Sequence, residues 1–135
     1  MMAAVADADA PFVAIVDDDA SVGRSTKRLL RSFGIDAQAF TSSEDFVQLV
    51  GSMPSYHPGC VILDVHMPGL SGLEVQRRLA GDRLPVIFIS AHDEPEVREQ
   101  ALAAGAIAFL RKPFRDDVFI QAVREALRRS AGEGK

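Results

Sequence analysis

The stretch Cys60-Val-Ile-Leu-Asp-Val-His-Met-Pro-Gly-Leu-Ser-Gly72 decides the fold. Its apolar run, residues 61–63, predicts a buried strand that stops at a single carboxylate, Asp64. A Met-Pro-Gly turn follows, and Ser71 and Glu74, three residues apart, predict a helix N-cap with a capping box. In open parallel α/β sheets, ligands bind at the carboxyl ends of the strands, so Asp64 is the first candidate for a functional residue.

The rest of the chain repeats this alternation of an apolar strand and an amphipathic helix. The expected strands cover residues 12–16, 35–40, 60–63, 86–89 and 107–110, and the helices after them begin near residues 21, 41, 73, 95 and 115. Five such alternations with right-handed crossovers predict an α/β flavodoxin-like (βα)5 doubly wound sandwich. Its helices cover both faces of a five-stranded parallel sheet of order 2-1-3-4-5.

Hydroxyl residues mark the expected starts of the first two helices. Ser21 is the expected cap of the first helix, and Thr41 with Glu44 forms a second expected capping box. The apolar positions of the helices follow a helical period, so we expect them to face the core. These positions include Phe33 at the end of the first helix and Leu102 in the fourth.

The length of 135 residues suits one domain with a core that needs no disulfides. We expect the domain over residues 12–130, a disordered N-terminal tail over 1–11, and a C-terminal tail or the start of a linker over 131–135. The apolar content of 47% and charged content of 25% are ordinary for a globular protein. The net charge of -4 argues against direct binding of nucleic acid.

The chain also lacks membrane and disulfide signals. No apolar run approaches the roughly 18–20 residues of a membrane span, and the first ten residues lack the pattern of a signal peptide. The single cysteine, Cys60, opens a predicted buried strand, so we expect an unreactive structural thiol. This cysteine usage fits a reducing, cytoplasmic compartment.

Polar residues follow the ends of four of the expected strands. They are Asp17, Asp18 and Asp19 after the first strand, Asp64 after the third, Ser90 after the fourth and Lys112 after the fifth. Taken singly, Asp19 is explained as a helix cap, Ser90 as a turn residue and Lys112 as a surface charge. In a parallel sheet, however, these ends share one edge, and carboxylates that meet there raise one another's pKa unless a cation intervenes. The cations indicated are Mg²⁺, which prefers oxygen ligands, and Lys112.

Four motifs, in order and with matching spacing, make the chain resemble the receiver domain of two-component response regulators. The motifs are Ile15-Val-Asp-Asp-Asp19, Leu63-Asp-Val-His-Met-Pro-Gly-Leu-Ser-Gly72, Phe88-Ile-Ser-Ala91 and Ala106-Ile-Ala-Phe-Leu-Arg-Lys-Pro-Phe114. The resemblance covers roughly residues 12–128. Residues 105–114 and the Ser90-Ala91 pair look most like receivers of the FixJ type.

The resemblance implies a role for each polar residue at this edge. Asp64 would accept a phosphoryl group from a phosphohistidine on a sensor histidine kinase. Asp18, Asp64 and the backbone carbonyl of His66 would bind Mg²⁺, with Mn²⁺ as an alternative ion. Asp17 would hold a metal-bound water, and Lys112 would pair with the phosphoryl oxygens.

The resemblance also implies how the signal would spread. Ser90 would hydrogen-bond a phosphoryl oxygen, and its hydroxyl would find a partner only after phosphorylation. Phe109 would turn inward as an aromatic switch, and the Lys112–Pro113 peptide would be cis. The imidazole of His66, with His92 near the same mouth, could alter the lifetime of the acyl phosphate.

The implied protein is a regulatory phosphoacceptor rather than a turnover enzyme. Phosphorylation would shift the packing of the fourth and fifth strands and of the fourth and fifth helices, and this face would control an output domain or partner, in transcription. A sensor kinase is the implied partner. A DNA-binding output domain beyond Lys135 and a homodimer formed on phosphorylation are further implied partners, with no direct contact to nucleic acid or membrane.

Two other functions stay open. A receiver-like interaction module could work without phosphorylation, although such modules usually lack one of the acids, the Lys or the hydroxyl residue, and all are present here. The second alternative is a haloacid-dehalogenase-type phosphatase, whose Asp-x-Asp motif would make Asp17 the nucleophile and leave Asp64 unused. Identification of the aspartate that is phosphorylated would separate these functions.

Overall fold

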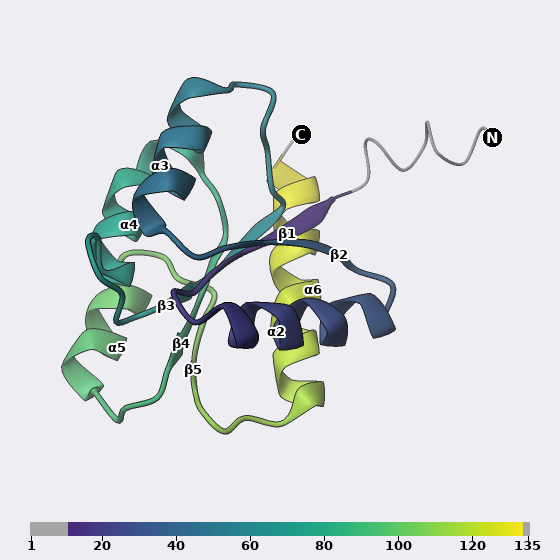
Figure 1. Cartoon of the computed structure of the whole chain (residues 1–135), viewed down its shortest axis with the longest axis vertical. Helices are drawn as coiled ribbons and strands as arrows, with labels where there is room; N and C mark the ends of the chain where they lie inside the picture. Colours follow the sequence, from purple (N-terminus) through teal and green to yellow (C-terminus); the bar gives the residue numbers. More distant parts are fainter. Residues whose placement is uncertain (1–10, 134–135) are drawn as a thin grey trace.

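The computed structural model describes residues 11–133, and it confirms the predicted flavodoxin-like sandwich (Figure 1). Five parallel strands form one sheet in the order β2-β1-β3-β4-β5. The strands are β1 (Phe12–Val16), β2 (Asp36–Phe40), β3 (Cys60–Asp64), β4 (Val86–Ser90) and β5 (Ala108–Arg111). The helices are α2 (Ala20–Ser32), α3 (Ser43–Ser52), α4 (Gly72–Arg78), the short 3-10 helix η1 (Ala80–Asp82), α5 (Pro95–Ala103) and α6 (Asp116–Glu133).

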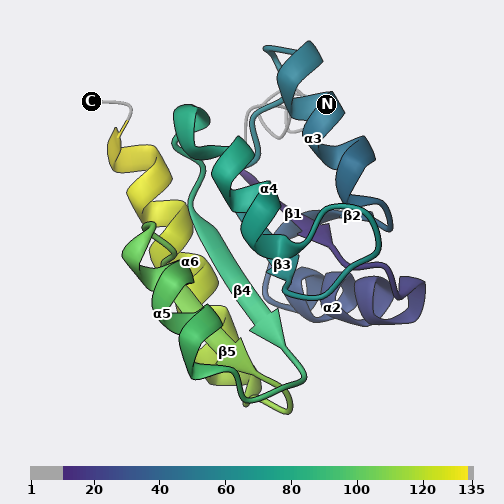
Figure 2. The ribbon, with the colours of Figure 1, turned by 90° about the vertical axis from the view of Figure 1, so that its left-hand side faces the viewer.

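The helices form two layers, with α2 and α6 on one face of the sheet and α3, α4 and α5 on the other (Figures 1 and 2). Successive residues of a strand point to opposite faces, so the apolar runs of the central strands supply both cores. One core joins Val13, Ile15, Ile62, Ile87 and Ile89 to Leu30 of α2 and to Phe119 and Val123 of α6. The other joins Ala14, Val16, Val61, Leu63 and Phe88 to Phe46 of α3, Val75 of α4 and Ala101 of α5.

Cys60 lies fully buried at the start of β3, as expected from its place in the sequence. Burial raises the pKa of its thiol far above the ordinary value. The thiol therefore stays protonated and acts as a small apolar side chain in the core.

Two helix caps differ from the predicted ones by one or two residues. The cap of α2 is Asp19, whose carboxylate accepts the N–H groups of Ser21 and Val22, so Ser21 is not the cap. The cap of α3 is Ser42, which accepts the N–H of Asp45, so Thr41 and Glu44 do not form a capping box. Each segment offers two polar residues within three positions, Asp19 and Ser21 in one and Thr41 and Ser42 in the other, and the backbone angles at the helix entry select one of them.

The predicted capping box of α4 is confirmed, and it starts the helix directly after the Asp64 loop. Ser71 Oγ accepts the backbone N–H of Glu74 at 3.3 Å, and the Glu74 carboxylate accepts the N–H of Ser71 at 2.9 Å.

Two apolar residues expected in the core lie at the surface instead. Phe33 is 42% exposed and Leu102 is 39% exposed. Phe33 is the C-cap of α2, where the helical period no longer fixes its direction, and the Arg124 guanidinium lies 5.7 Å from its ring centroid. Leu102 lies in the last turn of α5, next to Ala101, which is fully buried.

The final helix, α6, begins at Asp116, close to the expected start near residue 115, and continues to Glu133. The expected N-terminal tail over 1–11 falls outside the described residues except for residue 11, and in the expected C-terminal segment over 131–135 residues 134 and 135 fall outside them. Within the described residues, no helix has the length and apolar character needed to cross a membrane.

Candidate functional site

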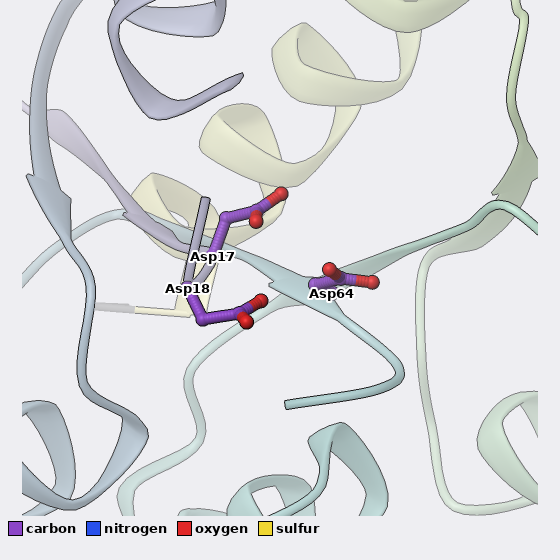
Figure 3. Close-up of side chains that lie close together, drawn as sticks. All are labelled: Asp17, Asp18 and Asp64. Carbon is purple, nitrogen blue, oxygen red and sulfur yellow. The ribbon is translucent and has the colours of Figure 1, made fainter. Parts of the chain in front are cut away.

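Three carboxylates meet where β1 and β3 end side by side. Val16 pairs with Leu63 in the parallel register, so the residues after each strand leave the sheet next to one another. One carboxylate oxygen from each of Asp17, Asp18 and Asp64 lies within 4.8 Å of the others. Figure 3 shows the three side chains gathered at this edge, Asp17 and Asp18 from the end of β1 and Asp64 from β3.

The innermost of these acids is Asp17, which is only 6% exposed. Desolvation raises the pKa of its carboxyl group above the ordinary value of 3.8. Two contacts oppose this rise, because the backbone N–H of Asp19 donates to Asp17 Oδ1 at 2.9 Å and Lys112 Nζ lies 3.7 Å from Asp17 Oδ2. The charge of Asp17 is therefore only partly compensated by the protein itself.

The carboxyl group of Asp64 is half-buried, and its pKa is also raised. Desolvation is the largest cause and the neighbouring charge of Asp17 is the next, while Lys112 acts in the opposite direction. The site therefore disfavours the ionised forms of Asp17 and Asp64, and a bound cation would stabilise these ionised forms. The donors are all oxygens, as a hard divalent ion requires, and Asp18 offers an exposed carboxylate to complete such a site.

Lys112 reaches the same edge from the far side of β4. Its backbone N–H donates to the carbonyl of Ser90 at 2.8 Å, which fixes the chain just after β5. The Lys112–Pro113 peptide bond is cis. The structure therefore brings the predicted counter-charge to the acidic cluster, with its ammonium directed at Asp17.

Ser90 is fully buried at the end of β4, and the expectation that its hydroxyl lacks a partner is wrong. Its Oγ accepts the N–H of His92 at 3.1 Å and can donate to the His92 carbonyl at 3.0 Å. Glu94 Oε1 lies 3.4 Å away as a second acceptor. The hydroxyl is already engaged within its own loop, because a serine that ends a strand readily bonds the backbone two residues on.

His66, which follows Asp64 by two residues, has a partner that the sequence did not reveal. Its Nε2 lies 2.6 Å from Glu94 Oε1, and its ring meets the His92 ring edge-on at 5.5 Å between centroids. Glu94 was not predicted as a site residue. No local pattern could have identified it, since the two partners lie 28 residues apart in the sequence.

Two further residues hold the loop after Asp64 in place. Gly72 donates its N–H to the carbonyl of Val65 at 2.9 Å, and a Cβ there would lie 2.6 Å from the backbone oxygen of Asp64. Buried Ser43 donates its hydroxyl to the carbonyl of Leu70 at 2.9 Å and so ties α3 to the same loop. The sequence signal for Gly72 was a glycine directly after a helix cap.

Phe109, the expected aromatic switch, lies in β5 beside Phe88 of β4. The two ring centroids are 6.0 Å apart, and Phe109 is partly buried. Its ring thus packs at the margin of the core that contains α4 and α5.

Comparison with known proteins gives one consistent family. The response regulator receiver domain family matches residues 13–124. The response regulator protein TmoT of Ectopseudomonas mendocina is 45% identical over 116 residues, which are 84% of this chain and 51% of the relative. The transcriptional regulatory protein FixJ of Azorhizobium caulinodans is 38% identical over 125 residues, 91% of this chain and 58% of the relative.

Solved structures agree. A crystal structure of a response regulator receiver protein from Burkholderia phymatum is 62% identical, with a TM-score of 0.79, and the match covers 87% of this chain and 95% of that one. The crystal structure of FixJ-N is 32% identical with a TM-score of 0.79, over 89% of this chain and 95% of that one. The chain spans about half the length of the curated relatives it matches.

Proposed function

The chain belongs to the response regulator receiver family, and on that premise we propose that it is the phosphoacceptor domain of a two-component system, with Asp64 as the acceptor. The arrangement at the sheet edge supports this proposal. Asp64 lies beside two further carboxylates, and Lys112 Nζ lies 3.7 Å from one of them, Asp17. A nucleophilic carboxylate, an oxygen-lined cation site and a fixed ammonium are the parts that phosphoryl transfer requires.

In the proposed reaction, an ionised Asp64 oxygen attacks the phosphorus of a phosphohistidine on a sensor kinase. The new O–P bond forms as the N–P bond breaks, and the leaving imidazole keeps the electron pair and takes up a proton. The product is an aspartyl phosphate, whose negative charge Lys112 opposes. Most of the acceleration in such a reaction comes from positioning and charge neutralisation.

The metal in this proposal is Mg²⁺, with Mn²⁺ as an alternative. Asp18, Asp64 and the backbone carbonyl of His66 would hold it, and Asp17 would bind through a water molecule. The ion would neutralise charge on the phosphoryl oxygens and relieve the repulsion among the three acids. The raised pKa values of Asp17 and Asp64 are the observation in favour of a cation at this place.

The proposed signal is a change in packing around β4 and β5. Ser90 would exchange a hydrogen-bond partner in its own loop for a phosphoryl oxygen, and the Phe109 ring would then turn inward. The face formed by β4, β5, α5 and α6 would then control an output domain or partner. The similarity to TmoT and FixJ, one a response regulator and one a transcriptional regulator by name, supports a role in transcription and membership of the FixJ-type subgroup.

The remaining parts of the proposal follow from the same premise. We place the receiver domain at residues 12–130, with 131–135 as a C-terminal tail or the start of a linker to a DNA-binding output domain, and we propose homodimer formation on phosphorylation. The unpaired, buried Cys60 suits a cytoplasmic location. The domain would assist its own phosphorylation without being a turnover enzyme.

Incubation with acetyl phosphate and Mg²⁺, followed by intact mass measurement, tests the acceptor. Wild type should gain one phosphoryl group, Asp64→Asn should gain none, and peptide mapping should place the group on Asp64. Asp19→Asn is the matched control, since asparagine also caps helices and this variant should label like wild type. Labelling of Asp17 would favour the phosphatase, and no labelling of wild type would favour a module that works without phosphorylation.

A further inference from the structure

One short hydrogen bond joins the two loops that flank Asp64. His66 lies in the loop after β3, Glu94 lies in the loop between β4 and α5, and their Nε2 and Oε1 atoms are 2.6 Å apart. A histidine that carries its proton on Nε2 donates this hydrogen bond to the carboxylate. The contact thus ties residues 91–94, the β4–α5 loop, to the residue two positions after the proposed acceptor.

The same Glu94 oxygen lies 3.4 Å from Ser90 Oγ. Ser90 has one hydroxyl proton, which it can give either to this carboxylate or to the His92 carbonyl at 3.0 Å. Either choice leaves no proton for a phosphoryl oxygen. One carboxylate therefore contacts both the proposed sensing hydroxyl and the loop that carries His66.

Glu94 is also the residue at the N-cap of α5, and its side chain makes no capping hydrogen bond. Capping side chains usually accept the N–H of the second or third helical residue. The Glu94 carboxylate is turned toward His66 and Ser90 instead, and only 26% of the side chain is exposed. Its position directly before Pro95, the first residue of α5, connects any movement of Glu94 to the start of that helix.

We propose that Glu94 is a positioning residue that holds the β4–α5 loop in its resting arrangement, and that it must leave Ser90 and His66 before Ser90 can bind a phosphoryl group on Asp64. The inference rests on the proposed function of Asp64. A phosphoryl group adds about two negative charges, and these repel a carboxylate that shares a donor with them. Departure of Glu94 removes one of the two acceptors that compete for the Ser90 proton, and it frees the N-terminus of α5 to move.

Binding of beryllofluoride, a mimic of the phosphoryl group, to the full chain with Mg²⁺ measures the effect of this contact. Glu94→Ala should bind about fivefold more tightly than wild type, since the mimic no longer competes with a charged hydrogen bond. Glu94→Gln keeps the shape and loses the charge, so it should fall between the two. Glu96→Ala is the matched control, because it removes the same charge from the exposed first turn of α5.

The imidazole nitrogen signals of His66 in NMR spectra report on the contact directly. Glu94→Ala should shift the His66 Nε2 signal, and beryllofluoride should shift it in wild type in the same direction. His57, which lies in the loop before β3, should be unaffected and serves as the internal reference. In Glu94→Ala, which has already lost the contact, beryllofluoride should shift the His66 signal less than in wild type, and this difference separates loss of the contact from a direct effect of the bound ion.

The outcomes separate this inference from the proposed function. If wild type binds beryllofluoride in a manner that requires Asp64, but Glu94→Ala and Glu94→Gln bind no more tightly, the positioning role is wrong. The role is also wrong if beryllofluoride leaves the His66 signal unchanged. If wild type does not bind the mimic, or binds it equally well as Asp64→Asn, the proposed function itself fails.

Discussion

The floor of the site and its rim are held by different kinds of contact. The floor comprises Asp17, Asp64, Gly72 and Ser43, and it is fixed by strand register, close backbone packing and buried hydrogen bonds. The rim comprises His66 and the β4–α5 loop, residues 91–94, where most side chains are exposed. The rim depends on polar contacts such as His66–Glu94 and the Arg111–Asp93 pair at 3.8 Å.

The difference indicates a division of labour between chemistry and signalling. Phosphoryl transfer depends on geometry to within fractions of an ångström, which close packing can provide. A switch needs contacts that can be exchanged at small free-energy cost, and exposed polar contacts meet that need. Substitutions in the floor should therefore change the free energy of unfolding more than substitutions in the rim. Four substitutions test this difference, from the largest expected effect to the smallest.

Gly72→Ala should give the largest loss of stability, because it introduces a Cβ into the closely packed backbone of the floor. The new Cβ would lie 2.6 Å from the backbone oxygen of Asp64 and 2.8 Å from Cε1 of Phe88. Both atoms are confined, so we expect a decrease in the free energy of unfolding of about 2–3 kcal/mol. Equilibrium unfolding in urea measures this decrease in the free energy of unfolding.

Gly51→Ala is the matched control for this substitution. Gly51 lies in α3, and a Cβ there meets nothing within 4 Å. Alanine favours the helix by about 0.5–1 kcal/mol over glycine, so this variant should be at least as stable as wild type. Equal losses at both glycines would contradict the close packing of the floor.

Ser43→Ala should have the next largest effect. It removes the hydrogen bond to the Leu70 carbonyl and leaves that acceptor without its partner from α3. For a side chain that is only 2% exposed, we expect a loss of about 1–2 kcal/mol. Ser55→Ala, at an exposed position of the loop before β3, should stay within about 0.5 kcal/mol of wild type in the same unfolding assay.

Asp17→Asn, in contrast, should increase the free energy of unfolding of the metal-free protein. The pKa of Asp17 is raised above 3.8, so its protonated form favours the folded state and that advantage is lost as the pH rises through the folded pKa. At pH 7 the variant should be more stable than wild type by on the order of 1 kcal/mol. The difference should shrink as the pH falls toward 3.8, the ordinary value of the pKa.

Unfolding in EDTA at several pH values measures this difference. Addition of Mg²⁺ should then stabilise wild type more than the variant, because ligands stabilise the state that binds them. Equal stability of the two proteins at pH 7 without metal would show that the ionised carboxylate of Asp17 does not destabilise the folded state.

The floor was largely predictable from the sequence, and the rim was not. Apolar runs that end in acids predicted the strand ends, and the alternation of elements predicted that Asp17 and Asp64 would meet. The capping box at Ser71 and Glu74 was predicted correctly because both partners lie within one helical turn. Such local signals are complete in themselves and need no knowledge of the rest of the chain.

The features that were missed depend on distant partners or on fine backbone geometry. Ser43 and Leu70 are 27 residues apart, and His66 and Glu94 are 28 apart. Asp19 and Ser21 were both expected as possible caps of the first helix, and the choice of Asp19 depends on backbone angles at a single residue. No periodicity encodes these outcomes, because they arise only when the loops at the sheet edge pack together.

The Arg111–Asp93 pair should show the smallest effect, and it tests the rim most directly. The two side chains are 61% and 74% exposed, and their charged atoms lie 3.8 Å apart. Water and salt screen such a pair, so Arg111→Ala should change the free energy of unfolding by less than about 0.5 kcal/mol. Asp93→Ala should match it, and the double variant should show little coupling. A loss above about 1 kcal/mol, or strong coupling, would place this loop with the rigid floor and remove the distinction between the two regions.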